Sequence, residues 1–290
     1  MNKDDADRWK SEVLDEIFVA IAASAELNKA MVFKGARVLS LRLGGGRQSL
    51  DLDSNLAVSF VDEYPGRASQ QDFLERMLTL AIRRAFARHD PVRYALEKLT
   101  VLSAKAHPLG WDAFNVKMSV ADLSRSVRSL PSLKIDIASP ESLLPHSVSP
   151  LDVGGYHVQA YTLQRIAGEK LRAFLSSLPT YRSKVKKPGD AIRSRDLYDI
   201  GRIHSVHGID EVDFWRGVGK EFRIACQSRY VDCDGLDTFQ EQWEVTRATY
   251  DGPTIPKDIP FDQAEAILEA VVAFFEAEGV VPFAFPLPKL

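Results

Sequence analysis

The 290-residue sequence contains only two cysteines, Cys226 and Cys233. They form no CxxC pair and have no neighbouring histidine at zinc-ligand spacing, so we expect neither a disulfide framework nor a structural zinc site. The sequence also lacks an apolar run of about 18 residues, the length that a membrane span needs. Its first residues, Met1 to Asp7, are acidic where a secretory signal would be basic and then apolar. These absences predict a cytoplasmic protein with reduced cysteines and no membrane contact.

The residues that are present describe an ordinary folded protein. Hydrophobic residues make up 45% of the sequence and charged residues 27%, with a formal net charge of −3. This length suits one large domain or two modest ones. The charge is unevenly distributed, because residues 165–205 hold ten basic and four acidic side chains. Such a segment is either a solvated face or a surface that meets phosphates.

The spacing of hydrophobic residues predicts an α+β protein with a mixed or antiparallel sheet. Residues 140–155 contain three prolines and a Gly-Gly pair, which favours a domain boundary there. We expect a sheet-containing domain over residues 1–145 and a mainly helical domain over residues 146–290, with a basic loop at 179–189. The expected strands cover 31–33, 50–53, 98–104, 114–120 and 133–137. The expected helices cover about 9–21, 36–43, 70–89, 163–178, 194–207, 211–226, 236–249 and 261–278.

Three aspartates are candidate ligands of a divalent metal. The alternation of Leu50-Asp51-Leu52-Asp53 places both aspartates on one face of a strand. Asp136 occupies the polar face of a second predicted strand. Mg²⁺ prefers hard oxygen ligands and leaves positions open for substrate phosphates, which suits three carboxylates, and Mn²⁺ would fit the same ligands. A DxD pattern by itself is also common in turns and edge strands.

Two predicted helices each carry one charge on their apolar side. On a helical wheel Lys170 falls in line with Ile166 and Phe174, and a lysine there is costly unless it has an anionic partner. Asp196 lies on the same face as its own helix's apolar residues, whereas Asp199 is predicted nearer the polar side. Lys170 and Asp196 therefore form either a structural ion pair between packed helices or part of a functional site.

Five segments together resemble the AbiEii/AbiGii family of nucleotidyltransferase toxins. The resemblance covers about residues 31–202, in the family's order and approximate spacing. The segments are Phe33 to Gly35, Arg47 to Asp53, Lys134 to Ile137, Tyr161 to Ala173 and Arg195 to Asp199. The resemblance implies a polymerase-β-like nucleotidyltransferase core followed by a helical domain. It also implies a toxin of an AbiE-like, type IV toxin–antitoxin system of phage defence. A cognate antitoxin is then expected, and whether the antitoxin binds the toxin directly is left open.

The resemblance assigns roles to particular residues. Asp51 and Asp53 would match the metal-binding carboxylates, and Lys170 and Asp196 the essential lysine and aspartate of the later motifs. The family usually reads KGG followed by Thr or Ser, where this chain has Lys34-Gly35-Ala36-Arg37, so Arg37 would meet phosphate by charge in place of a hydroxyl. The expected nucleotide-binding residues are Lys34, Gly35, Arg37, Arg47, Ser49 and Lys170. The expected catalytic residues are Asp51, Asp53, Asp136, Lys170 and Asp196, with Asp51, Asp53 and Asp136 on the metal.

The expected reaction is Mg²⁺-dependent transfer of a nucleoside monophosphate from an NTP to RNA. The resemblance favours the 3′ end of tRNA, whose modification blocks translation and growth. Basic residues of the 182–187 loop, together with Arg83, Arg84 and Arg88, would follow the RNA backbone. Two alternatives remain open at this point. One is transfer to a small molecule or a protein side chain, and the other is a non-catalytic protein that binds a nucleotide or the antitoxin.

Overall fold

The computed structural model describes residues 2–104, 112–125, 130–186 and 191–288. The chain forms two compact units. The sheet unit consists of Met1–Val38, Gln48–Glu141 and Ser149–Tyr161. The helical unit consists of Leu39–Arg47, Ser142–Val148 and Thr162–Leu290. Each unit is thus assembled from segments that lie far apart in the sequence.

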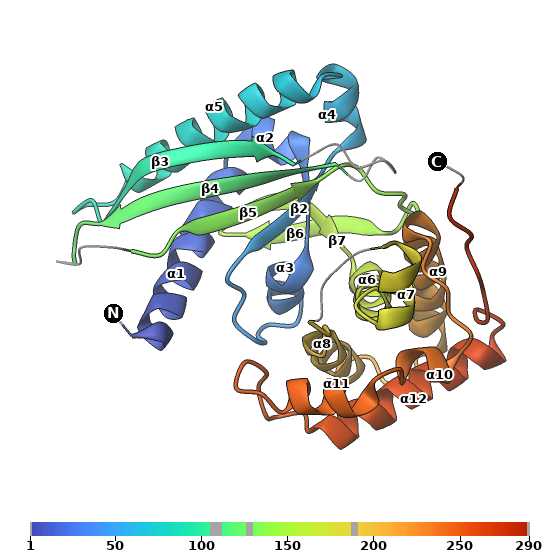
Figure 1. The fold of residues 1–290 in the computed structure, drawn as a ribbon. Coiled ribbons are helices and arrows are strands. Elements are labelled where there is room, and N and C mark those ends of the chain that lie inside the picture. The colour runs from blue at the N-terminus through green and yellow to red at the C-terminus, as the bar shows by residue number, and fades with distance from the viewer. Residues whose placement is uncertain (1, 105–111, 126–129, 187–190, 289–290) are drawn as a thin grey trace. The chain divides into compact units, whose positions relative to one another are not determined.

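The sheet unit is built on one seven-stranded mixed sheet with the order β3-β4-β5-β2-β1-β7-β6 (Figure 1). The central strand β2 pairs antiparallel with β1 and parallel with β5, while β1 pairs parallel with β7. The predicted mixed sheet is confirmed. The strands are β1 (Met31–Lys34), β2 (Leu52–Leu56), β3 (Tyr94–Ser103), β4 (Ala113–Asp122), β5 (Leu133–Ala138), β6 (Val148–Val153) and β7 (Tyr156–Tyr161).

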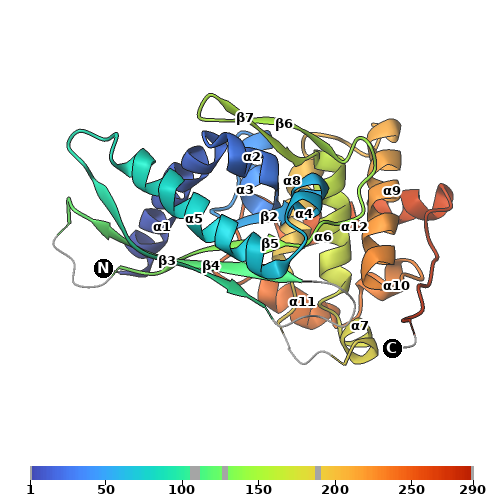
Figure 2. The same ribbon diagram turned by 90° about the horizontal axis from the view of Figure 1, so that it is seen from above.

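The helices of the sheet unit bury its apolar face. Helix α1 packs against α5, and α5 packs against β3 (Figure 2). Val13 and Ile17 of α1 and Leu74, Leu78 and Ile82 of α5 are fully buried, as their helical spacing requires. The helices that begin in this unit are α1 (Lys3–Ala22), α2 (Ala25–Ala30), α3 (Gly35–Arg42), α4 (Val58–Glu63) and α5 (Arg67–Phe86).

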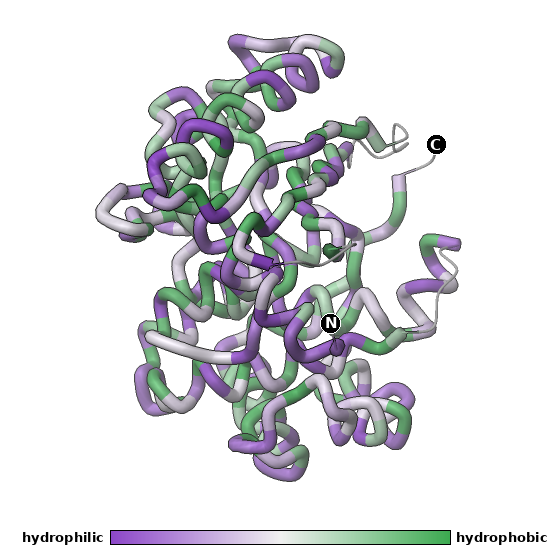
Figure 3. The backbone as a smooth tube through the Cα atoms, turned by 90° about the vertical axis from the view of Figure 1, so that its left-hand side faces the viewer, coloured by the Kyte–Doolittle hydropathy of each residue, from purple (hydrophilic) through white to green (hydrophobic). Residues whose placement is uncertain are grey.

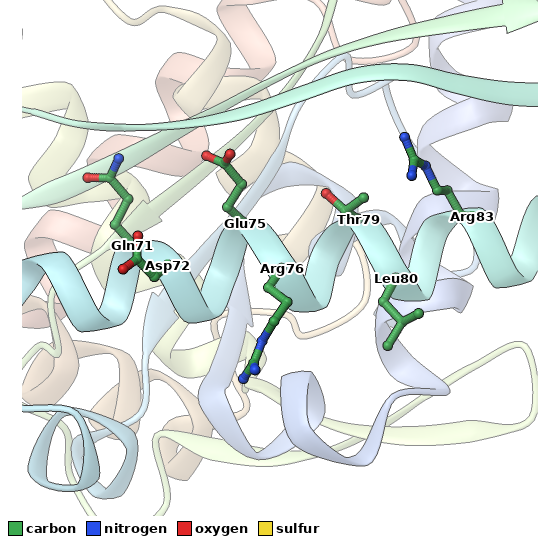
Figure 4. A pocket seen from close by; sticks show the side chains of 7 residues that line it. All are labelled: Gln71, Asp72, Glu75, Arg76, Thr79, Leu80 and Arg83. Carbon is green, nitrogen blue, oxygen red and sulfur yellow. The ribbon is translucent and has the colours of Figure 1, made fainter.

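Helix α5 also covers the edge strand β3. Gln71 donates a hydrogen bond to the Val101 carbonyl over 2.9 Å, and Glu75 accepts one from the Val101 N–H over 3.0 Å. Figure 4 shows both side chains pointing to the same side of the helix, around a shallow hollow on α5. Unpaired groups on an edge strand attract other strands. These two side chains therefore satisfy backbone groups that would otherwise be open to pairing.

The helical unit is organised around α6. This helix packs against α8 and α9, and α8 packs against α12. Thr162 caps α6 through a hydrogen bond from the Arg165 N–H, as predicted from its position before the apolar stripe. The helices are α6 (Leu163–Leu175), α7 (Pro179–Lys184), α8 (Arg195–His204), α9 (Val212–Arg229), α10 (Leu236–Phe239), α11 (Trp243–Tyr250) and α12 (Phe261–Ala277).

Three segments differ from the expectation. Residues 148–161 form a hairpin of the sheet, because Gly154 and Gly155 have φ of +61° and +84° and close a two-residue turn. The division into units consequently does not fall at residues 145 and 146. The predicted basic loop contains helix α7, and Lys187 of that loop lies outside the described residues. The predicted helix 236–249 is two helices, because the backbone turns left-handed at Gln242, with φ of +56°.

Hydrophobic and hydrophilic residues are interspersed along the chain (Figure 3). Within the described residues, no helix has both the length and the apolar composition to span a membrane. The two cysteines are free and buried, and burial raises the pKa of Cys233 to about 12. Both thiols are therefore protonated packing groups near neutral pH.

Candidate active site

A row of polar residues crosses three neighbouring strands of the sheet unit. Lys34 at the end of β1 pairs in register with Asp53 of β2, and Asp53 pairs with Asp136 of β5. Residues paired across strands project from the same face of a sheet. The register therefore brings together two aspartates that lie 83 positions apart in the sequence, as the site prediction requires. Asp51 lies just before β2, which begins at Leu52 and not at Leu50 as predicted.

Gly35 lies directly against the Asp53 carboxylate. Its φ is +81°, and a Cβ built on it would lie 2.2 Å from Asp53 Oδ2. No residue with a side chain fits this position without moving the carboxylate. The Lys34-Gly35 segment and Asp53 are thus adjacent, while their roles in binding nucleotide and metal remain predictions.

The carboxylate of Asp136 is electrostatically strained. Burial and the nearby charge of Asp51 raise its pKa above the ordinary value of 3.8, and Lys134 opposes the shift. Among the described residues no three acidic, histidine or cysteine side chains are already gathered as a metal site. The donor chemistry nevertheless fits Mg²⁺, since Asp53 and Asp136 are hard oxygen donors in register and Asp51 adds a like charge that a cation would neutralise.

Ser49 and Arg37 hold the segment that leads to Asp51. The Ser49 hydroxyl donates to Asp51 at 3.0 Å, with both the Asp51 carbonyl and Oδ1 as acceptors. The buried guanidinium of Arg37 donates to the Ser49 carbonyl over 2.6 Å and forms an ion pair with Asp15. Arg37, which was expected to contact phosphate, is therefore bonded within the protein. Its observed contacts position Ser49.

Lys34 is also paired within the sheet unit. Its Nζ lies 3.0 Å from Glu141 Oε1, and Tyr161 donates to the other oxygen of the same carboxylate. The ammonium group lies 5.8 Å from the centroid of the Tyr161 ring. Contact with a phosphate would require the Lys34 side chain to leave this carboxylate.

The helical unit holds a second group of charges, centred on Lys170 of α6. Lys170 is only 7% exposed, and its Nζ lies 3.0 Å from Asp196 Oδ1 and 2.5 Å from Asp199 Oδ2, both on α8. Arg193 approaches the other oxygen of Asp196 at 2.6 Å. Burial alone would neutralise these groups, but the ion pairs raise the pKa of Lys170 and hold the pKa of Asp196 well below its usual range. The predicted pairing of Lys170 with Asp196 is present.

Arg47 joins the same group through Asp199. Its Nε and Nη2 donate to the two oxygens of Asp199, each over 3.0 Å, in a bidentate pair. Arg47 was expected on the triphosphate, and Asp199 was expected nearer the polar side of its helix. The second expectation is wrong, because Asp199 is 1% exposed. Helix α8 is buried around almost its whole circumference, so its amphipathic pattern does not separate an inner from an outer face.

A sequence signal for Asp199 was available. It lies three residues after Asp196, a spacing that places two side chains side by side on a helix. Two carboxylates so placed, opposite a buried lysine, indicate that a second cation is needed to balance them. Arg47 supplies this additional charge for Asp199, and Arg193 does so for Asp196.

The family model of the AbiEii toxin, a nucleotidyl transferase of type IV toxin–antitoxin systems, matches residues 17–277. The chain belongs to the AbiEii family. Two solved structures from Helicobacter pylori, one described as a nucleotidyltransferase and the other as JHP933, are similar to this AbiEii chain with TM-scores of 0.53 and 14% identity. The alignments cover 96% of this chain, and 97% and 94% of those chains respectively. No curated protein matches the chain.

The likeness to these structures shows a nucleotidyltransferase fold, so the predicted fold class is confirmed. AbiEii membership supports nucleotidyl transfer as the general activity and implies an antitoxin as a partner. The matched region includes every residue expected in the active site.

Proposed function

We propose that this AbiEii-family protein is a Mg²⁺-dependent enzyme that transfers a nucleoside monophosphate from an NTP to the 3′ end of tRNA and thereby blocks translation. The observation that carries the proposal is the row in which Gly35 lies against Asp53 while Asp53 is in register with Asp136. A backbone segment without a side chain next to paired carboxylates suits a triphosphate with its metal.

In this mechanism Asp51, Asp53 and Asp136 would hold Mg²⁺, which supplies charge neutralisation at the phosphates. The acceptor hydroxyl oxygen forms a bond to the α-phosphorus. The bond between the α-phosphorus and the oxygen that bridges the α- and β-phosphates breaks, and pyrophosphate leaves. Asp136 activates the acceptor hydroxyl, either by accepting its proton or by orienting it through the metal. Ser49 orients Asp51 through the hydrogen bond to its carboxylate.

Lys170 would neutralise the phosphates, with Asp196 holding it in place. The group around it contains the cations Arg47, Lys170 and Arg193 and two carboxylates, so it carries one net positive charge. The AbiEii family model spans the residues of this group as well as the sheet carboxylates.

The decisive experiment is incubation of the purified protein with Mg²⁺, total tRNA and each labelled NTP in turn. Asp53→Asn removes a proposed metal ligand, and Asp152→Asn makes the same change at an exposed residue of strand β6 as a matched control. We expect label on tRNA with the wild type and the control but not with Asp53→Asn. If a protein or a small molecule is labelled in the absence of RNA, that molecule and not tRNA is the acceptor. If no NTP gives label while expression still arrests growth, the transferase proposal fails and a binding mechanism is favoured.

The surface of α5 is the proposed contact for the RNA backbone. Arg76, Leu80 and Arg84 of α5 are exposed at intervals of four residues, about 6 Å apart along a helix, and the exposed Arg88 lies in the turn after the helix ends at Phe86. Figure 4 shows Arg76 and Leu80 on the same side of the helix. From Arg76 to Arg88 the chain has no acidic residue. Regularly spaced arginines of this kind contact phosphates without reading bases.

The α5 contact is tested with Arg84→Glu/Arg88→Glu. We expect tRNA labelling to fall at least tenfold and to become less sensitive to salt, because fewer counterions are released on binding. Binding of the NTP alone should be unchanged. The control Lys3→Glu/Arg8→Glu changes the charge by the same amount at two exposed sites on α1. Wild-type labelling by the double variant would show that RNA meets another surface.

A further inference from the structure

We infer that Asp199 is a positioning residue of this site, holding Arg47 and Lys170 together as a paired phosphate-binding unit. The inference rests on the proposed function, since it assumes that these two cations meet the nucleotide. Asp199 lies within ion-pair distance of both Arg47, at 3.0 Å, and Lys170, at 2.5 Å. It is also nearly fully buried, so water does not screen either pair.

The two aspartates of α8 have separate partners. Asp196 pairs with Lys170 and with Arg193, whose side chain is 43% exposed. Asp199 pairs with Lys170 and with Arg47, whose side chain is 13% exposed. Without Asp199, Arg47 would lose its bidentate carboxylate partner and Lys170 would keep only Asp196 of this pair of aspartates, so the repulsion between the two cations would be less well balanced. Asp199 therefore sets the distance between the cations, and Asp196 alone cannot do so.

Through its contact with Arg47, Asp199 also fixes the glycine segment that precedes Arg47. Arg47 follows Gly44, Gly45 and Gly46, whose φ values of +65°, +146° and +152° give the segment little stiffness of its own. Asp199 fixes the end of this segment, and Arg202, one helical turn further on α8, donates to the Gly45 carbonyl. Ser49 and Asp51 follow within four residues. Asp199 and Arg202 thus anchor the glycine segment and Arg47 to α8 within the helical unit.

The test compares NTP binding with folding in the full-length protein. Binding of the Mg²⁺ complexes of ATP, CTP, GTP and UTP is measured by calorimetry, and folding by thermal unfolding. We expect Asp199→Asn to weaken binding of the preferred NTP at least tenfold. Arg47→Gln, which breaks the pair from its other side, should have a similar effect, and should not add fully to that of Asp199→Asn in the double variant.

Two further variants separate positioning from mere stability. Glu221→Gln removes another buried carboxylate of the helical unit, one paired with Arg165 at 3.2 Å, and should lower the melting temperature without changing NTP binding. The reversed pair Arg47→Asp/Asp199→Arg should regain stability over the single variants but not NTP binding, because the cation then sits on α8.

The outcomes are distinct. Asp199→Asn or Arg47→Gln binding NTP within twofold of wild type would overturn the positioning role, as would recovery of both stability and binding by the reversed pair. If the folded wild type binds none of the four NTPs, the proposed function itself fails, and the positioning role falls with it.

Discussion

The backbone of Gly35 lies directly against the carboxylate of Asp53. We predict that Gly35→Ala abolishes nucleotidyl transfer, because its Cβ would overlap Asp53 Oδ2. Gly44→Ala is a matched control, since Gly44 also has a positive φ but has no atom within 4 Å of the added Cβ. Both substitutions should cost about 1 kcal/mol of unfolding free energy through backbone strain. Labelling of tRNA by the two purified variants checks the difference.

Asp136 illustrates a conflict between stability and activity at one residue. Its raised pKa means that the charged form is disfavoured in the folded protein. We predict that Asp136→Asn raises the melting temperature at pH 7 while transfer is lost. As the pH falls through the raised folded-state pKa, wild-type Asp136 becomes neutral and the stability difference should disappear. Melting curves from pH 7 down to pH 4 test this, and a variant less stable than wild type at pH 7 would contradict it.

At this scale the sequence predicted some positions better than others. The helical wheel found Lys170 and Asp196, because α6 has a clear apolar stripe in which a lysine needs a partner. It misplaced Asp199, because α8 is enclosed on nearly all sides. The ion pairs of Lys34 with Glu141 and of Arg37 with Asp15 could not be predicted, since each joins segments that only the tertiary fold brings together.

At the scale of elements, the contact between α6 and α9 depends on Gly168. A Cβ there would lie 2.6 Å from the Phe222 nitrogen and 2.8 Å from the Glu221 carbonyl carbon, which are backbone atoms that cannot turn away. We predict that Gly168→Ala lowers the unfolding free energy by about 1–3 kcal/mol. Denaturant unfolding monitored by circular dichroism measures the change.

Gly217 of α9 provides the comparison for Gly168. A Cβ at Gly217 would meet Gln164 Cγ at 3.1 Å, and that flexible side chain can move. Gly217→Ala should therefore be neutral or stabilising by up to about 1 kcal/mol, through the higher helix propensity of alanine. Equal destabilisation by both alanines would show that the helices do not approach each other closely at Gly168.

Most helices and strands could be predicted from the sequence, and each prediction that failed has a local cause. Helices α5 and α6 and strands β4 and β5 follow hydrophobic periodicity closely. The β6–β7 hairpin was missed, because three prolines and two glycines resemble a linker when the pairing partner is unknown. Residue 160 of β7 pairs with residue 33 of β1, and no local pattern indicates so distant a neighbour.

At the scale of the whole molecule, a chain cut at the predicted domain boundary, residue 145, would lack part of the sheet. A chain ending there lacks β6 and β7 and leaves the apolar strand β1 without its parallel neighbour. We predict that residues 1–145 self-associate, whereas residues 1–161, which keep all seven strands, do so much less. Size-exclusion chromatography of the two chains at equal concentration distinguishes them, and identical profiles would contradict the prediction.

The overall site could be predicted only as a set of residues, not as an arrangement. The α+β class and the order of motifs follow from local patterns and from the family resemblance. The clustering of Arg47 with α8 could not be predicted from such patterns. The segment Leu39–Arg47 stands between two parts of the sheet unit in the sequence, but its contacts place it in the helical unit. Hydrophobic periodicity carries no information about such an exchange of segments.

The pair between Arg47 and Asp199 joins residues 152 positions apart, and this separation has a consequence for biosynthesis. The ribosome makes Arg47 long before α8, so a nascent chain lacks Asp199 during most of translation. An incomplete polypeptide that stops before residue 199 lacks the anchor for the glycine segment altogether. If the proposed toxin activity depends on this anchor, truncation products would be inactive and each new molecule would become active only late in its synthesis, as a consequence of chain topology alone.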